Sequence, residues 1–122
     1  YMAESCEQRG CCGIQYAVEA DGSVYPCDFY VMDEYQIGNF NTDSFDQMDQ
    51  KRSEIRFIEQ SSQVEKACRS CPYFLLCRGG CRRNRGNGMQ TEPTRNNFCE
   101  GYKIFFEKWY DTLMQLGKLV QR

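Results

Sequence analysis

The pattern of apolar and polar positions is clearest near the C-terminus. After Cys99, large apolar side chains recur every three or four residues, which is the spacing of one face of an α-helix. They are Tyr102, Phe105, Phe106, Trp109, Leu113, Leu116 and Val120. Asn97 and, three residues on, Glu100 match a capping box at the start of such a helix. The sequence therefore predicts a long C-terminal helix, whose apolar face should pack on this domain or on a neighbouring one.

Alternating apolar and polar residues predict a β-hairpin in the first third of the chain. In IQYAVEADGSVYPCD, residues 15–19 and 23–25 have strand character, and Asp21-Gly22 accepts the positive φ of a tight turn. Pro26 has no amide hydrogen to donate, so we expect the second strand to end there.

A second helix is predicted over residues 44–60, SFDQMDQKRSEIRFIEQ, with an imperfect apolar face. The candidate N-terminal caps are Asn41, Thr42 and Asp43. Residues 60–101 show no sustained period and hold five of the nine cysteines, so we expect loops there rather than core.

Length and charge narrow the class of protein. A chain of 122 residues suits one domain, and we interpret residues 1–122 as a single unit. A formal charge of −2 gives no general attraction to nucleic acid or to anionic membranes. The chain has no apolar run of about 18 residues, and YMAESCEQRG lacks the core of a signal peptide. We expect a soluble, cytoplasmic protein, and a start at Tyr1 suggests a segment of a longer chain.

The nine cysteines carry the candidate chemistry, and disulfides, zinc and iron–sulfur clusters are the alternatives. An odd number of cysteines and the two-residue gap between Cys68 and Cys71 argue against disulfides. Four thiolates suit zinc, and CRSC is typical of a zinc knuckle. The absence of histidine, together with Gly79-Gly80 inside CRSCPYFLLCRGGC, favours a bulkier [4Fe–4S] cluster that the backbone can approach closely.

An arginine-rich segment surrounds this cysteine run. Its side chains could offset the negative charge of a thiolate-bound cluster, or could form an ordinary solvated basic loop. The residues are Arg78, Arg82, Arg83 and Arg85.

The order of seven cysteines resembles the SPASM domain, the auxiliary-cluster module of radical S-adenosylmethionine (SAM) enzymes that modify peptides. Cys12 is followed by nine residues, Gly22, four residues and Cys27, and then by Cys68, Cys71, Cys77, Cys81 and Cys99. CGIQYAVEADGSVYPCDFYVMDEYQIGN and CRSCPYFLLCRGGCRRNR look like the anaerobic sulfatase-maturating enzymes in particular. The resemblance covers residues 6 to about 103.

The resemblance implies a small, loop-rich α+β fold organised around two [4Fe–4S] clusters. The implied ligands of the first cluster are Cys6, Cys12, Cys27 and Cys81, and those of the second are Cys68, Cys71, Cys77 and Cys99. Cys11 is left over. A compact run whose fourth cysteine binds the other cluster has a parallel in two-cluster ferredoxins.

The implied reaction is oxidation of a sulfatase cysteine or serine to Cα-formylglycine, started by a 5′-deoxyadenosyl radical. The chain has no CxxxCxxC motif, so SAM and a third [4Fe–4S] cluster would belong to an N-terminal radical SAM domain, and the fragment alone should be inactive. The expected partners are that domain, an unfolded sulfatase peptide, and an electron carrier such as ferredoxin or flavodoxin.

Asp28 is the candidate catalytic residue. It follows Cys27 in the family's CDFY motif and, by this resemblance, would be the general base; a backbone-capping role is the alternative. Two alternatives for the whole chain stay open. One is a zinc-bearing interaction module with the arginine-rich loop as its partner surface, and the other is the SPASM domain of a different peptide-modifying enzyme.

Overall fold

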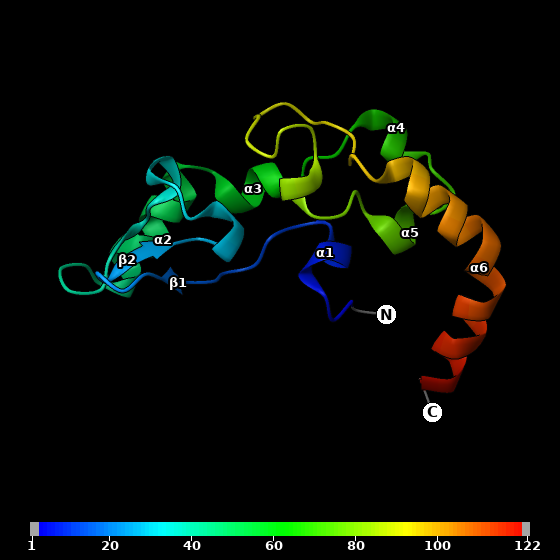
Figure 1. The fold of residues 1–122 in the computed structure, drawn as a ribbon, viewed down its shortest axis with the longest axis horizontal. Helices are drawn as coiled ribbons and strands as arrows, with labels where there is room; N and C mark the ends of the chain where they lie inside the picture. Colours follow the sequence, from blue (N-terminus) through cyan, green and yellow to red (C-terminus); the bar gives the residue numbers. More distant parts are fainter. Residues whose placement is uncertain (1–2, 121–122) are drawn as a thin grey trace.

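The computed structural model describes residues 3–120 as an elongated α+β chain (Figure 1). A small antiparallel sheet and helix α2 form one end, and α4, α5 and α6 form the other. The strands are β1 (Ala17–Val18), β2 (Ser23–Tyr25) and β3 (Gly38–Asn39). The helices are α1 (Cys6–Arg9), α2 (Phe45–Glu54), α3 (Phe57–Ser62), α4 (Lys66–Arg69), α5 (Phe74–Cys77) and α6 (Cys99–Val120). Three single 3₁₀ turns lie at Asp28–Tyr30, Asp33–Tyr35 and Arg82–Asn84.

The predicted hairpin is confirmed. Strands β1 and β2 pair antiparallel, with Val18 opposite Val24, and β2 ends at Tyr25 before Pro26. Gly22 in the turn has φ +87°, and a Cβ there would lie 2.5 Å from the Asn41 side chain. Strand β3 was not predicted, because two residues that include a glycine are too few to show alternation.

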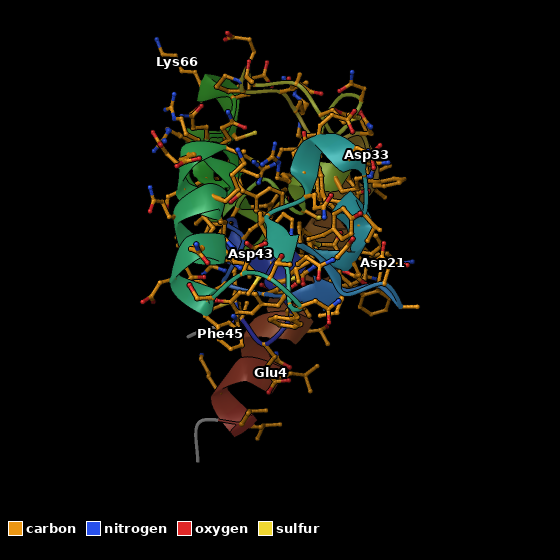
Figure 2. The ribbon with its side chains drawn as sticks, turned by 90° about the vertical axis from the view of Figure 1, so that its left-hand side faces the viewer. Glu4, Asp21, Asp33, Asp43, Phe45 and Lys66 are labelled. Atoms are coloured by element: carbon orange, nitrogen blue, oxygen red, sulfur yellow. The ribbon has the colours of Figure 1, made fainter. Side chains whose placement is uncertain are left out.

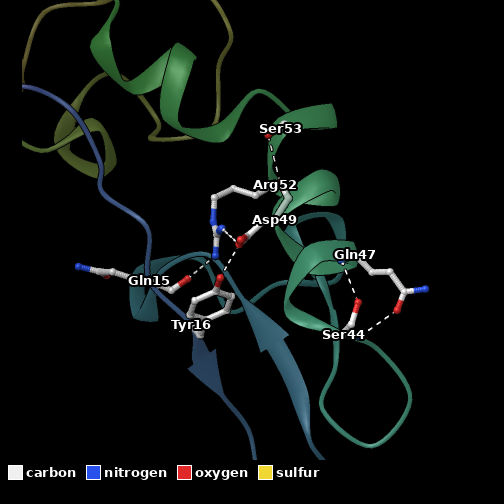
Figure 3. Close-up of polar contacts among 7 residues, drawn as sticks. All are labelled: Gln15, Tyr16, Ser44, Gln47, Asp49, Arg52 and Ser53. Atoms are coloured by element: carbon white, nitrogen blue, oxygen red, sulfur yellow. Dashed lines mark hydrogen bonds and ion pairs between the residues drawn. The ribbon is translucent and has the colours of Figure 1, made fainter.

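The predicted helix over residues 44–60 is two helices. Ser44, rather than Asn41, Thr42 or Asp43, is the cap of α2, and it forms a capping box with Gln47 (Figure 3). The Asp43 carboxylate instead accepts the Asn39 amide hydrogen (2.7 Å) in the turn after β3. Arg56, with φ 53°, separates α2 from α3.

The break redirects the chain so that both helices bury a side chain. Met48 of α2 packs with Val24 and Ile37, while Phe57 of α3 meets the Tyr30 ring edge to face, with centroids 5.0 Å apart. Met48, Val24 and Phe57 are fully buried. Figure 2, viewed from the sheet end, shows α2 running beside the strands, with Phe45 at its beginning.

Arg52 fastens α2 to the segment that enters β1. Its buried guanidinium donates to the Gln15 carbonyl (2.6 Å) and to Asp49, which also accepts the Tyr16 hydroxyl (Figure 3). The same guanidinium lies over the Tyr16 ring. The anchor fixes the chain at Gln15 and Tyr16, three and four residues after Cys12.

The long C-terminal helix is confirmed, but its apolar face is only partly packed on the described part of this chain: Phe106 and Tyr110 contact the Tyr73 ring, and Tyr102 donates its hydroxyl to Glu7. No residue of α6 is buried, and Ile104 and Val120 are 67% and 84% exposed. Its C-terminal half extends away from the other elements (Figures 1 and 2). Asn97 donates its side-chain amide to the Gly86 carbonyl (2.8 Å), so it supports the preceding loop instead of a capping box. None of the helices within residues 3–120 combines the length and apolar character needed to span a bilayer.

Candidate metal centre

The cysteines line two separate cavities. The first has a volume of about 220 Å³, and its wall includes Cys6, Cys11, Cys12, Cys27 and Cys81. The second has a volume of about 160 Å³, and its wall includes Cys68, Cys71, Cys77 and Cys99. All nine cysteines are free thiols. Each cavity therefore contains all members of one of the two sets implied by the sequence, and the first also contains Cys11.

Segments far apart in the sequence build the first cavity. Cys6 comes from α1, Cys12 from the extended segment after it, Cys27 from the end of the hairpin, and Cys81 from the turn before Arg82–Asn84. Ser61, which is buried at the end of α3, accepts the Cys12 amide hydrogen (2.7 Å) and holds this segment in place. Sequence reasoning missed Ser61, because one serine in the polar run EQSSQ carries no distinguishing signal.

Short helical turns build the second cavity. Cys68 lies on α4, Cys77 closes α5 and Cys99 begins α6, with Cys71 between the first two helices. These turns replace the irregular loop that the sequence predicted, and four-residue helices are too short to show a periodic pattern.

The thiols of each set surround a volume rather than a point. Within residues 3–120, no three Cys, Asp or Glu side chains gather closely enough to hold a single metal ion. A zinc ion draws four thiolates to about 2.3 Å from its centre. A multi-iron cluster instead places its irons and inorganic sulfides between the thiolates, so its ligands stand further apart. The donor chemistry and the cavities fit the larger group.

The thiols that raise one another's pKa values belong to the same cavity. Burial raises the pKa of Cys12, and Cys81 and Cys6 add to this effect. Burial likewise raises the pKa of Cys27 to about 12, with contributions from Asp28 and Cys12.

In the second set, burial and then Cys99 and Glu65 raise the pKa of Cys68. Burial, followed by the charges of Cys99, Cys68 and Cys71, raises the pKa of Cys77. Since the thiolate is the metal ligand, a cation in either cavity would stabilise the charged form that burial disfavours.

Gly79 and Gly80 form the link between the two cavities. They join Cys77 of the second set to Cys81 of the first, and both have positive φ, at +87° and +63°. A Cβ on Gly80 would lie 2.4 Å from the Asn96 amide nitrogen, and one on Gly79 would lie 2.7 Å from Val64. Only glycine fits the link without strain.

Asp28 lies at the wall of the first cavity, as its position beside Cys27 suggested. It is exposed, and its carboxylate accepts a hydrogen bond from the Cys27 thiol (3.3 Å). The Cys27 sulfur in turn accepts the Phe29 amide hydrogen (3.5 Å). Once Cys27 is a thiolate it has no proton to donate, which leaves the Asp28 carboxylate exposed beside the cavity.

Two of the four arginines do not belong to a solvated loop. Arg82 and Arg85 are 6% and 4% exposed, and both line the first cavity. Arg78 donates to the Gln8 carbonyl (2.8 Å), and Arg83 donates to the Asn87 carbonyl (3.2 Å). The charge of this segment is therefore directed partly into the protein.

Comparison with known proteins agrees with this geometry. The family described as SPASM, an iron–sulfur cluster-binding domain, matches residues 10–72. The chain is 40% identical over 115 residues to a cysteine-type anaerobic sulfatase-maturating enzyme of Clostridium novyi, covering 94% of this chain and 31% of that enzyme. It is 30% identical over 104 residues to a serine-type anaerobic sulfatase-maturating enzyme of Bacteroides thetaiotaomicron, covering 84% of this chain and 25% of that enzyme.

A solved structure extends the likeness to three dimensions. The structure of native anSMEcpe with bound AdoMet and Cp18Cys peptide superposes with a TM-score of 0.86 at 37% identity. The match covers 97% of this chain and 33% of that one. The chain thus spans about a third of the length of the relatives that it resembles.

The glycine link gives a direct test of the described geometry. We expect Gly80→Ala to lower the free energy of unfolding by roughly 1–3 kcal/mol, because alanine at this positive φ is strained and its Cβ would meet Asn96. Gly13→Ala in the wall of the same cavity is the matched control, since a Cβ at Gly13 meets nothing within 4 Å. Urea denaturation of both variants measures the difference. Equal stabilities would contradict the tight packing of the link.

Proposed function

The chain belongs to the SPASM family of iron–sulfur cluster-binding domains, and from this premise we propose that it carries two auxiliary [4Fe–4S] clusters of an anaerobic sulfatase-maturating radical SAM enzyme. The domain is residues 1–122, and its proposed reaction is oxidation of a sulfatase cysteine or serine to Cα-formylglycine. The single observation that carries the proposal is the grouping of the nine thiols around two cavities, five around the first, Cys11 included, and four around the second.

The two ligand sets follow the cavities. Cys6, Cys12, Cys27 and Cys81 would hold the first cluster, and Cys68, Cys71, Cys77 and Cys99 the second. The thiol spacing supports iron–sulfur clusters over a zinc module, because no set converges on one point. The similarity to sulfatase-maturating enzymes over most of the chain supports this family over other peptide-modifying relatives.

The electron balance of the reaction defines what the residues must do. Abstraction of a hydrogen atom from the substrate Cβ by the 5′-deoxyadenosyl radical gives 5′-deoxyadenosine and a carbon radical. That radical becomes a thioaldehyde or aldehyde when the substrate loses one electron and one proton. An auxiliary cluster held by these cysteines would accept the electron, and hydrolysis of a thioaldehyde with water would release sulfide and leave the aldehyde.

Asp28 is the proposed acceptor of the proton. Its exposed carboxylate lies beside the first cavity, where a peptide thiol or hydroxyl can reach it. Phe29 next to it is 60% exposed and offers apolar surface to the same peptide. The proposed partners are a radical SAM domain that binds SAM and a third cluster, an unfolded sulfatase peptide, and a ferredoxin or flavodoxin. The peptide-bound structure of the similar anSMEcpe supports the peptide partner.

The proposal predicts about eight irons per chain, because each [4Fe–4S] cluster contains four. Iron and sulfide analysis after anaerobic reconstitution measures this number, and the protein should be brown and bleach with dithionite. Stoichiometric zinc with negligible iron, in protein produced anaerobically, would reject the proposal.

The adjacent pair Cys11-Cys12 gives a second test. We expect Cys12→Ser to lose the first cluster, about half of the iron, and Cys11→Ser to retain both. Cys12 is partly buried and electrostatically coupled to Cys81 and Cys6, whereas Cys11 is exposed. Iron loss confined to the Cys11 variant would show that Cys11, and not Cys12, is the cluster ligand.

Asp28→Asn tests the general base. It keeps the size of the side chain and removes its basicity, so peptide oxidation by the full-length enzyme should fall by roughly 10²-fold or more. Iron content should stay unchanged, and 5′-deoxyadenosine should still form, because hydrogen abstraction does not need this base. A near-normal formylglycine yield would make Asp28 a structural residue, and lost iron would make it a cluster-supporting one.

A further inference from the structure

Arg85 is a buried cation whose partners are all backbone carbonyls. It is 4% exposed, and its guanidinium donates to the carbonyl oxygens of Gly79 (3.0 Å), Gly80 (2.7 Å), Ser61 (2.7 Å) and Gln63 (3.0 Å). Among residues 3–120, none of the ion pairs involves Arg85, so no carboxylate balances its charge. A charge removed from water without a counter-charge is strongly unfavourable.

The ionisable groups whose charges act on Arg85 come from both cavities. Burial lowers its pKa, whereas the thiols of Cys12 and Cys81 from the first set and Cys68 from the second favour its charged form. Arg82 is the nearby cation that opposes it. Arg85 itself lines the first cavity, and Gly79, whose carbonyl it binds, lines the second. The guanidinium therefore lies in the wall between them.

Arg85 also holds the peptide link that spaces the two ligand sets. Its Nε and Nη2 bind the carbonyls of Gly79 and Gly80, the two residues between Arg78 and Cys81. Its Nη1 binds Ser61 and Gln63, at the end of α3 and just after it. Asn96 donates to the same Gly79 carbonyl (3.2 Å). The side chain thus fixes the link to α3 at the same point where it places its charge.

From this geometry we infer that Arg85 is a positioning residue shared by both clusters: its guanidinium is the common counter-charge of the two thiolate sets and fixes the distance between them. The inference rests on the proposed function. A cation beside a cluster stabilises its reduced, more negative state, so Arg85 raises the reduction potential of both clusters. Lysine keeps the charge but lacks the fork of donors that binds four carbonyls.

Arg82 provides a matched comparison within the same segment. It is similarly buried and, like Arg85, lines the first cavity, where it donates to the Phe57 carbonyl (2.9 Å) and lies over the rings of Tyr30 and Phe57. Unlike Arg85, it donates to none of the described residues in the wall of the second cavity. Arg56 provides a remote control, because its guanidinium is exposed and paired with Glu59. Loss of such a surface pair has little energetic consequence.

The experiment measures both midpoint potentials by EPR-monitored redox titration of the anaerobically reconstituted full-length protein. The variants are Arg85→Met, Arg85→Lys, Arg82→Met and Arg56→Met. Arg85→Met should shift both potentials downward, Arg82→Met only one, and Arg56→Met neither. Arg85→Lys should bring both potentials back toward the wild-type values.

The outcomes separate this inference from the proposed function. Wild-type protein without two clusters would reject the proposed function, whatever the variants do. With two clusters in the wild type, an Arg85→Met variant that shifts one potential or neither overturns the shared role. If the Arg85→Met variant binds no iron, the Arg85→Lys variant decides between the roles. Two clusters in Arg85→Lys, at potentials near those of the wild type, support the counter-charge role of Arg85. An Arg85→Lys protein without iron overturns that role in favour of a purely steric one.

Discussion

The link from Cys77 to Cys81 is the constraint on which the rest of the chain depends. It passes from the wall of one cavity to the wall of the other, and its glycines have backbone conformations that leave no room for a side chain. Because each end of the link belongs to a different cysteine set, neither cavity can be assembled without placing the other. The hairpin, α3 and α6 are distant in sequence, yet each contributes a residue to these walls or supports one.

The limited apolar core explains why the cavities have so much influence on the fold. The buried apolar cluster of Val24, Ile37 and Met48 lies at the sheet end, and α6 at the other end has no buried residue. Around the link, several of the buried side chains are polar, namely Ser61, Arg82, Arg85 and Asn96, and Val64 is an apolar one. The two arginines donate to the backbone carbonyls of Phe57, Ser61, Gln63, Gly79 and Gly80, but none of the ion pairs within residues 3–120 gives either charge an anionic partner other than the thiols. On the proposed function, two sets of cluster-bound thiolates would supply that partner, which would link cofactor binding to folding thermodynamically.

The sequence predicted the parts of the fold that have a repeated pattern or a defined turn. The hairpin follows from Asp21-Gly22 and Pro26, and α6 follows from seven apolar residues at helical spacing. The break at Arg56 was not predictable, because a left-handed residue other than glycine has no local signal and depends on the burial of Met48 and Phe57. Helices α4 and α5 were also not predicted, because a single helical turn contains too few residues to show an apolar face.

The sequence could predict which cysteines belong to the site, but it could not predict where the charged side chains around them lie. The order and spacing of the thiols carried the family resemblance, that resemblance implied the two sets, and the members of each set line one cavity. A run such as RGGCRRNR reads as a basic surface, whereas the fold turns Arg82 and Arg85 inward and Arg78 and Arg83 toward other backbone carbonyls. The reason is tertiary: two of the four carbonyls that accept from Arg85, those of Ser61 and Gln63, lie 24 and 22 residues earlier in the chain, at the end of α3 and just after it. The same contacts make the two cavities unequal, since both buried arginines and Asp28 border the first, while the second is bordered by the more exposed Arg95 and Lys103. A cluster in the first cavity would therefore lie beside two buried guanidinium groups and beside Asp28, the only carboxylate among the described residues that line either cavity, so the proposed proton acceptor and this cluster would share one wall.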